Sequence, residues 1–292
     1  MRFGIHYIYW QRDLSCSSYV PYVERAKRDG FDALELGDYL ILSMSDREVE
    51  ELAAAARDQQ IQLILGLDPP QDRALTADDP AQRAAGVDFY CTVLPKLERL
   101  GIATLGGHFL NAVPRPPQTI HAAEEWAYGV KSMRTLGELA ADHGVCLCVE
   151  AVNRFQGHIL NTARQGVRFV SEVGSPNVKL LLDTFHMNIE ESSPAGAILA
   201  TGDCLGHFHF VDNHRGLPGT GHIDFASIRD ALVHVGYEGT LTMEALVRSG
   251  GALGDAAYLW RDLTAGADEA DLDRQAACSL AGMRVLFANG MR

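Results

Sequence analysis

The chain contains little positive charge. Its 292 residues include 25 Lys and Arg against 38 Asp and Glu, so the formal net charge at pH 7 is -13. Proteins that bind nucleic acid irrespective of sequence need a surface rich in Lys and Arg, because these side chains displace counterions from the phosphates. The composition therefore argues against nucleic acid as a partner.

Long hydrophobic runs and paired cysteines are missing too. No apolar stretch approaches the roughly 20 residues that span a bilayer, and residues 1–6 lack the charged-then-apolar order of a secretory signal. We therefore expect a cytoplasmic protein with no membrane partner. The six cysteines are scattered and form no C-x-x-C pair, which indicates neither a zinc knuckle nor a disulfide framework.

Short apolar runs recur roughly every 30 residues, with helical patterns between them. Strands are predicted at residues 3–7, 33–36, 61–65, 103–106, 145–150, 178–183, 205–211 and 240–244. Helices are predicted at residues 46–59, 80–100, 122–143, 162–173 and 225–235, with a C-terminal helix at 272–287. Glycines that suit a left-handed cap stand just beyond helix ends, at Gly30, Gly101, Gly144, Gly174 and Gly236.

Eight alternations of strand and helix predict parallel strands joined by right-handed crossovers. Eight such units close most simply into a (β/α)₈ TIM barrel, here a single domain over residues 1–292 with a C-terminal helical extension. A doubly wound open sheet is the alternative. It usually carries a glycine fingerprint after the first strand, and residues 10–13 contain none.

Four consecutive predicted strands end in, or contain, a side chain that can bind metal. These side chains are Glu150, Asp183, the pair His207 and His209, and Glu244. Such strand ends meet at one mouth of a barrel, and buried carboxylates there cost several kcal/mol unless a cation compensates them. Each residue alone could instead cap a helix or pair with an arginine, but capping does not explain four successive strands. A mainly oxygen site suits Mn²⁺, Mg²⁺ or Co²⁺.

Nearby residues leave alternatives open. His207 and His209 lie on the same face of an extended strand, so periodicity alone cannot choose the ligand. His186 follows Asp183, where a loop over the metal would begin, and could either bind a hydroxyl group or cap the next helix. Residues 216–221 are rich in glycine but bring only Arg215 as positive charge, so a plain turn is favoured over a phosphate site.

The sequence resembles the D-tagatose 3-epimerase family of ketose 3-epimerases, which includes the D-psicose 3-epimerases, within the xylose isomerase-like barrel superfamily. The segments that carry the resemblance are EAVNRF at 150–155, LDTFHMNIEE at 182–191, GHFH at 206–209 and PGTGHI at 218–223, with shorter matches at 4–5, 9–10, 161–163, 243–244 and 260–262. They follow the family order along nearly the whole chain.

This resemblance implies a substrate and a ligand set. The metal ligands it implies are Glu150, Asp183, His209 and Glu244, and the substrate contacts are His186 and Arg215. It implies one divalent cation, Mn²⁺ foremost and otherwise Co²⁺ or Mg²⁺, and a small keto-sugar substrate. Glu150 and Glu244 would remove and return the C3 proton on opposite faces of the sugar. The family also forms dimers and tetramers, so we expect a homodimer or homotetramer.

The chain departs from the family pattern in three places. Gln156 stands where a glutamate is usual, and His6 stands where the family has an aromatic side chain. The segment Gly66-Leu67-Asp68-Pro69 also differs from the usual glycine-rich one. We expect His6 and Gln156 to bind the substrate and to affect how the far end of the sugar is held.

Three rival functions are considered. An aldose-ketose isomerase of the same superfamily would move the proton between C1 and C2. A sugar-binding protein could have kept the site and lost turnover because of Gln156. A phosphoesterase acting on abasic DNA shares the barrel ancestry, but the acidic composition and the single predicted metal cluster argue against it.

Overall fold

Eight parallel strands close into a barrel in the computed structural model, which describes residues 1–14, 16–37, 40–110 and 122–289. The strands follow chain order around the barrel, and β1 pairs with β8. The predicted (β/α)₈ class is confirmed, and the open sheet is excluded. The strands are β1 Arg2–His6, β2 Ala33–Leu36, β3 Gln62–Gly66, β4 Thr104–Gly107, β5 Cys146–Ala151, β6 Val178–Asp183, β7 Leu205–His209 and β8 Thr240–Met243.

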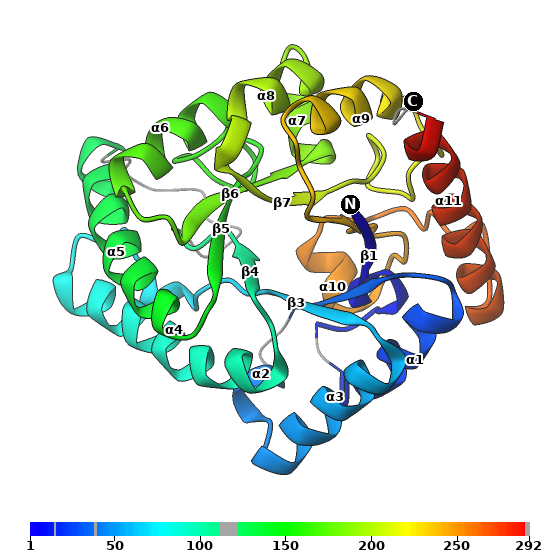
Figure 1. Ribbon diagram of the computed structural model, residues 1–292, viewed down its shortest axis with the longest axis horizontal. Coiled ribbons are helices and arrows are strands. Elements are labelled where there is room, and N and C mark those ends of the chain that lie inside the picture. The colour runs from blue at the N-terminus through cyan, green and yellow to red at the C-terminus, as the bar shows by residue number, and fades with distance from the viewer. Residues whose placement is uncertain (15, 38–39, 111–121, 290–292) are drawn as a thin grey trace.

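Helices surround this ring of strands (Figure 1). They are α1 Val20–Arg28, α2 Leu40–Ser43, α3 Asp46–Gln59, α4 Pro80–Leu100, α5 Ala122–Asp142, α6 Ala163–Val173, α7 Thr184–Glu190, α8 Pro194–Thr201, α9 Phe225–His234, α10 Gly251–Ala256 and α11 Glu269–Asn289. The predicted C-terminal helix is α11, which is tied to α1 by the Arg25–Asp273 ion pair and to α9 by Arg229. Among the helices of the described residues, none has the length and hydropathy needed to cross a membrane.

Local sequence signals explain where several helices begin. Ser45 caps α3 in a capping box with Glu48, and Thr162 caps α6 in the same way with Gln165. Elements α3, α4, β2 and β6 occupy the predicted residues, and the other predicted elements shift by one to three residues at their ends. The five glycines expected at helix ends all have positive φ.

One local prediction is wrong. No loop follows Asp183, because α7 begins at Thr184 and His186 lies within it. Asp183 is the N-cap of this helix, and its Oδ1 accepts a hydrogen bond of 2.8 Å from the backbone N–H of Phe185. His186 is therefore held on a helix rather than on a loop.

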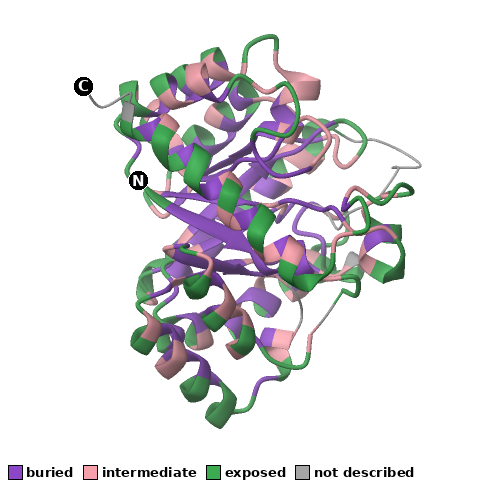
Figure 2. Cartoon of the chain, turned by 90° about the vertical axis from the view of Figure 1, so that its right-hand side faces the viewer, coloured by how far each residue is buried: buried purple, intermediate pink, exposed green. Residues whose placement is uncertain are grey.

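The strands are buried on both faces, inside the barrel and against the helices (Figure 2). Ile5, Leu34, Leu65 and Leu105 are completely buried, as expected for apolar strands of a parallel barrel. Glu35 is the exception within β2, because it is a completely buried carboxylate between two leucines. Such a charge needs partners, and it has them at the candidate site.

The strand register brings the predicted ligands to one end of the barrel. Asp183 is level with His209 across β6 and β7, and Glu150 is level with Leu181 across β5 and β6. Strand β8 ends at Met243, so Glu244 follows it directly. The carboxyl ends of four neighbouring strands therefore carry the candidate site.

Candidate active site

A cavity of about 340 Å³ lies at the carboxyl ends of the strands. Its lining includes most of the predicted site residues, namely His6, Glu150, Gln156, His209, Arg215 and Glu244. Glycines at the ends of β2, β3 and β4 provide the room. A Cβ atom on Gly37, for example, would lie 2.6 Å from Cε1 of His6.

Glu150, Asp183 and His209 form a compact ligand group. Each offers one ligand atom, and these atoms all lie within 4.8 Å of one another. All three side chains are buried. Because Oδ1 of Asp183 is occupied by the backbone of α7, its Oδ2 is the oxygen left for the site.

Unpartnered polar atoms are concentrated here. Within the described residues, nine buried side-chain nitrogen and oxygen atoms have no hydrogen-bond partner, and six belong to this site. The six are His108 Nε2, Glu150 Oε1, Asp183 Oδ2, His186 Nε2, His209 Nδ1 and Arg215 Nε. Each such atom costs about 1–3 kcal/mol, and a bound cation and ligand would supply the missing partners.

Glu244, the fourth predicted ligand, is held beside this group by Arg215. Nη2 of Arg215 lies 2.6 Å from Oε2 of Glu244 and 4.0 Å from Oδ2 of Asp183. The same Oε2 lies 3.6 Å from Nδ1 of His209. Burial opposes ionisation of Glu244, but Arg215 and His209 lower the pKa of this carboxyl group well below its usual value.

The other two carboxyl groups are poorly compensated. Burial, reinforced by the charge of Glu244, raises the pKa of Glu150 to about 8 and that of Asp183 to about 7. His108 opposes the rise at Glu150, and Arg215 opposes it at Asp183. Two buried carboxylates with free oxygens beside a free imidazole nitrogen fit a divalent cation, which would compensate their charge.

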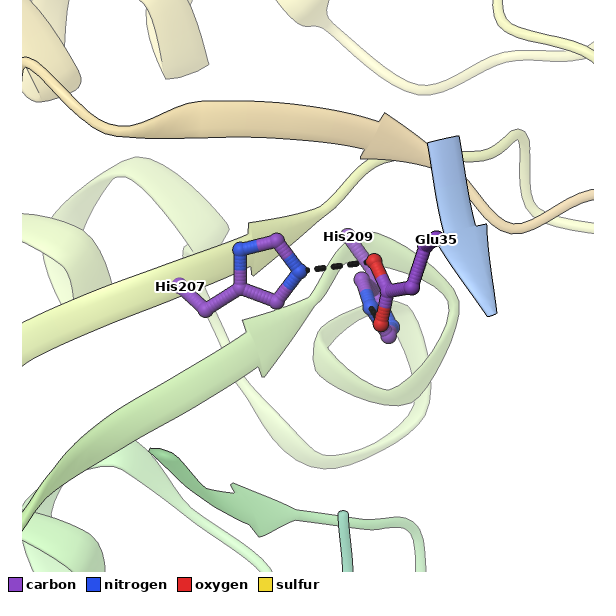
Figure 3. Close-up of side chains that lie close together, drawn as sticks. All are labelled: Glu35, His207 and His209. Atoms are coloured by element: carbon purple, nitrogen blue, oxygen red, sulfur yellow. Dashed lines mark hydrogen bonds and ion pairs between the residues drawn. The ribbon is translucent and has the colours of Figure 1, made fainter. Parts of the chain in front are cut away.

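Glu35 fixes the orientation of His209 (Figure 3). Its Oε1 lies 2.9 Å from Nε2 of His209, and its Oε2 lies 2.8 Å from Nε2 of His207. Burial alone would raise the pKa of Glu35, but the two imidazoles hold it well below its usual value, so the carboxylate can only accept. His209 therefore donates from Nε2 and presents Nδ1 to the ligand group, whereas Nε2 of His207 is directed to Glu35.

His186 presents the opposite nitrogen. Its Nδ1 accepts hydrogen bonds from the backbone N–H of Asn153 at 3.2 Å and from the Asn153 amide at 2.8 Å. A backbone N–H can only donate, so Nε2 of the neutral His186 ring carries the proton. Burial lowers the pKa of His186 well below its usual value, which keeps the ring neutral. Nε2–H lies 3.5 Å from Oε1 of Glu150 and is a donor rather than a metal ligand.

Comparisons with known proteins identify the family to which this barrel belongs. Residues 23–267 match the xylose isomerase-like TIM barrel family. The chain is 40% identical over 288 residues to a D-psicose 3-epimerase of Agrobacterium fabrum, which covers 98% of this chain and 99% of the relative. It is 39% identical to a D-psicose 3-epimerase of Ruminiclostridium cellulolyticum, covering 96% of each chain. A crystal structure of D-psicose 3-epimerase in the presence of D-fructose superposes with a TM-score of 0.96 at 40% identity, covering 98% of this chain and 99% of that one.

The chain belongs to the ketose 3-epimerase family. The resemblance seen in the sequence is thereby confirmed, and the protein is an enzyme of the isomerase class. The role of each individual site residue stays a prediction.

The sequence did not reveal that three further residues, Glu35, Asp68 and His108, belong to this ketose 3-epimerase site. A lone glutamate between Leu34 and Leu36 was the available signal for the first. Asp68 lies two residues after the end of β3, and His108 follows β4 directly, so the rule that strand ends carry the site would have found both. His6 is buried beside the cavity, where its Nδ1 accepts from the backbone N–H of Ile8.

Proposed function

We propose that the protein epimerises a free ketose at C3. Glu150, Asp183, His209 and Glu244 would hold one divalent cation, and Glu150 and Glu244 would transfer the protons. The observation that carries this proposal is the convergence of six unpartnered buried polar atoms on one cavity. Membership of the ketose 3-epimerase family supports it independently.

A bound divalent cation would polarise the carbonyl group of the ketose and stabilise the negative charge that develops when C3 loses its proton. One glutamate takes that proton, and the electron pair of the C–H bond becomes the C2–C3 double bond of an enediolate. The other glutamate, protonated, returns a proton to C3 from the opposite face, and the carbonyl group re-forms. The two glutamates exchange protonation states, so the epimer that is bound decides which one acts first.

Neighbouring side chains would orient the sugar. His186 Nε2–H and the unpartnered Nε–H of Arg215 are donors that can only serve an oxygen of the substrate or of the ligand group. Gln156 and His6 border the same cavity and would contact the part of the sugar farther from the cation. These contacts would hold the sugar between the two glutamates.

The relatives suggest which ketoses to test first. Two are named for D-psicose, and a solved structure was determined in the presence of D-fructose. We propose this pair of C3 epimers, followed by D-tagatose and D-sorbose, as candidate substrates.

The test is deuterium incorporation at C3 of a ketose panel in D₂O with Mn²⁺, before and after chelation. Metal-dependent label at C3 together with the C3 epimer is the expected result. Label at C1 or C2 with an aldose product would instead indicate an aldose-ketose isomerase. Thermal stabilisation by a sugar without any exchange would indicate a non-catalytic binder and overturn the proposal.

Four further features belong to the same proposal. The donor set of three carboxylates and one imidazole suits Mn²⁺, with Co²⁺ or Mg²⁺ as alternatives. We also propose that residues 1–292 form one domain, that the protein works in the cytoplasm, and that it assembles as a homodimer or homotetramer. Exposed Tyr258 and Trp260 support assembly through the segment after Gly250, and light scattering tests it.

A further inference from the structure

We infer that Asp68 and His108 form a further substrate-binding element, which recognises the hydroxyl group on C4 of the ketose. The inference rests on the proposed function and adds a specificity determinant to it. Asp68 follows β3 and His108 follows β4, so both lie at the end of the barrel that carries Glu150. Both side chains line the same cavity.

Two hydrogen bonds fix the His108 ring. Oδ1 of Asp68 accepts from the backbone N–H of His108 at 2.8 Å, and Oδ2 lies 2.7 Å from Nδ1 of the ring. Gly107 makes this close approach possible, because it has φ of +142° and a Cβ there would lie 2.9 Å from Oδ1 of Asp68. The ring therefore cannot turn without breaking a bond to a carboxylate.

The fixed ring directs Nε2 at the place where the reaction is proposed to occur. Nε2 is buried without a hydrogen-bond partner and lies 3.6 Å from Oε2 of Glu150. His186 lies on the other oxygen of the same carboxylate, 3.5 Å from Oε1. Glu150 is thus flanked by one histidine on each oxygen. A sugar hydroxyl both donates and accepts, so it can pair with Nε2 of His108 in either protonation state.

A second cation is a poorer explanation of this arrangement. His108, Glu150 and His186 are close enough to hold one. However, Nδ1 of His186 accepts two hydrogen bonds from Asn153, so its Nε2 carries a proton and has no lone pair to offer. Only His108 and Glu150 remain as ligands, one fewer than the three that the protein supplies at a catalytic zinc site.

The position of His108 relative to Glu150 indicates which hydroxyl group of the sugar it contacts. Glu150 must reach the hydrogen on C3, so a group 3.6 Å from its Oε2 lies beside the substituents of C3. The carbonyl group on C2 and the hydroxyl on C3 are the oxygens expected at the cation. The nearest remaining polar group is the hydroxyl on C4.

The experiment compares kcat/KM for D-fructose, its C4 epimer D-tagatose and 4-deoxy-D-fructose. The wild type should convert the 4-deoxy sugar roughly 3- to 15-fold less efficiently than D-fructose, as expected for one lost hydrogen bond. In His108→Ala the two sugars should be converted equally well, and the preference between D-fructose and D-tagatose should shrink by a similar factor. Asp68→Asn should change the same ratios in the same direction.

His143→Ala is the matched control. His143 is also paired with a carboxylate, at 2.8 Å from Glu98, but it lies beyond the end of α5 and outside the cavity. In His143→Ala the ratios of kcat/KM between the three sugars should equal those of the wild type. The wild-type comparison with the 4-deoxy sugar needs no variant, so it decides the matter even where His108→Ala does not fold.

The outcomes separate the two proposals. If the wild type epimerises D-fructose and 4-deoxy-D-fructose equally well, or if His108→Ala slows both sugars by the same factor, the role of His108 is refuted and the epimerase proposal stands. If the wild type converts no ketose at all, the proposed function fails and this inference fails with it.

Discussion

Replacing Glu150 with glutamine should make the metal-free protein more stable at neutral pH. Glutamine keeps the shape of the side chain but cannot ionise. The carboxyl group of Glu150 is buried among other acidic groups, and its pKa is raised from 4.5 to about 8. A group whose pKa is higher in the folded than in the unfolded state contributes stability below its unfolded pKa and loses that contribution as the pH rises toward the folded pKa.

The magnitude follows from the two pKa values. At pH 7 the unfolded chain is 2.5 pH units above its Glu150 pKa of 4.5, while the folded protein still holds the proton. One pH unit corresponds to about 1.4 kcal/mol. The free energy of unfolding of the metal-free wild type at pH 7 should therefore be about 3 kcal/mol lower than that of Glu150→Gln. The difference should fall to about 1 kcal/mol or less at pH 5, where the unfolded chain gains little from ionising.

Urea denaturation at pH 5 and pH 7 in the presence of a chelator measures this difference. Glu138→Gln, an exposed glutamate on α5, is the control and should change the free energy of unfolding by less than about 0.5 kcal/mol at either pH. Mn²⁺ at a thousandfold excess over Kd should reverse the order at pH 7, because the wild type then gains about 4.1 kcal/mol, which exceeds the deficit of about 3 kcal/mol. Equal stability of the two metal-free proteins at pH 7 would refute the reasoning, since Glu150 would then be ionised and compensated without a cation.

Three further predictions follow from the same geometry. Glu35→Gln should weaken metal binding about 10- to 100-fold in calorimetry, because the amide no longer fixes both imidazoles, and unchanged affinity would contradict the orienting role of Glu35. Metal affinity should rise roughly a hundredfold or more from pH 6 to pH 8. The reason is that Asp183, with a pKa of about 7, and Glu150, with a pKa of about 8, must lose their protons before a cation binds. If calorimetry shows the same affinity at both pH values, these pKa values are contradicted. Glu150→Gln and Glu244→Gln should each lower epimerisation by about 10²–10⁴-fold, and a variant that keeps substantial activity would exclude its glutamate as a base.

The barrel could be predicted because its signals are local and repeated. Apolar strands recur eight times, with capped helices and glycines of positive φ between them, and a closed parallel barrel is the simplest sheet that joins eight such strands. The helix after Asp183 could not be separated from a loop by this reasoning. Its start depends on one side chain, because Asp183 both caps α7 with Oδ1 and faces the site with Oδ2.

The ligand group was predictable in outline but incomplete. Strand-end carboxylates mark the mouth of the barrel, and the structure brings Glu150, Asp183 and His209 together there. Glu35 escaped notice because it acts through His209 and lies deeper in the barrel, on a strand 174 residues away in sequence. The pairing of Asp68 with His108 depends on the register of β3 and β4 and on the absence of a side chain at Gly107. The periodicity of the sequence predicts neither.

The hydrogen-bond partners of His186 and His209 decide whether each ring faces the cation or the sugar. His186 and His209 both lie beside the acidic group, and the sequence shows only that each can bind metal or donate a proton. The carboxylate of Glu35 accepts a hydrogen bond from Nε2–H of His209, so Nδ1 is the nitrogen left for a cation. Burial lowers the pKa of this ring, but Glu35 and Glu244 outweigh burial and raise the pKa well above its usual value, so a proton on Nδ1 must leave before a cation binds. Asn153 does the reverse at His186, because its N–H groups occupy Nδ1 and leave Nε2–H as a donor for a sugar oxygen. The division of the cavity into a cation side and a substrate side therefore depends on which partner each ring meets.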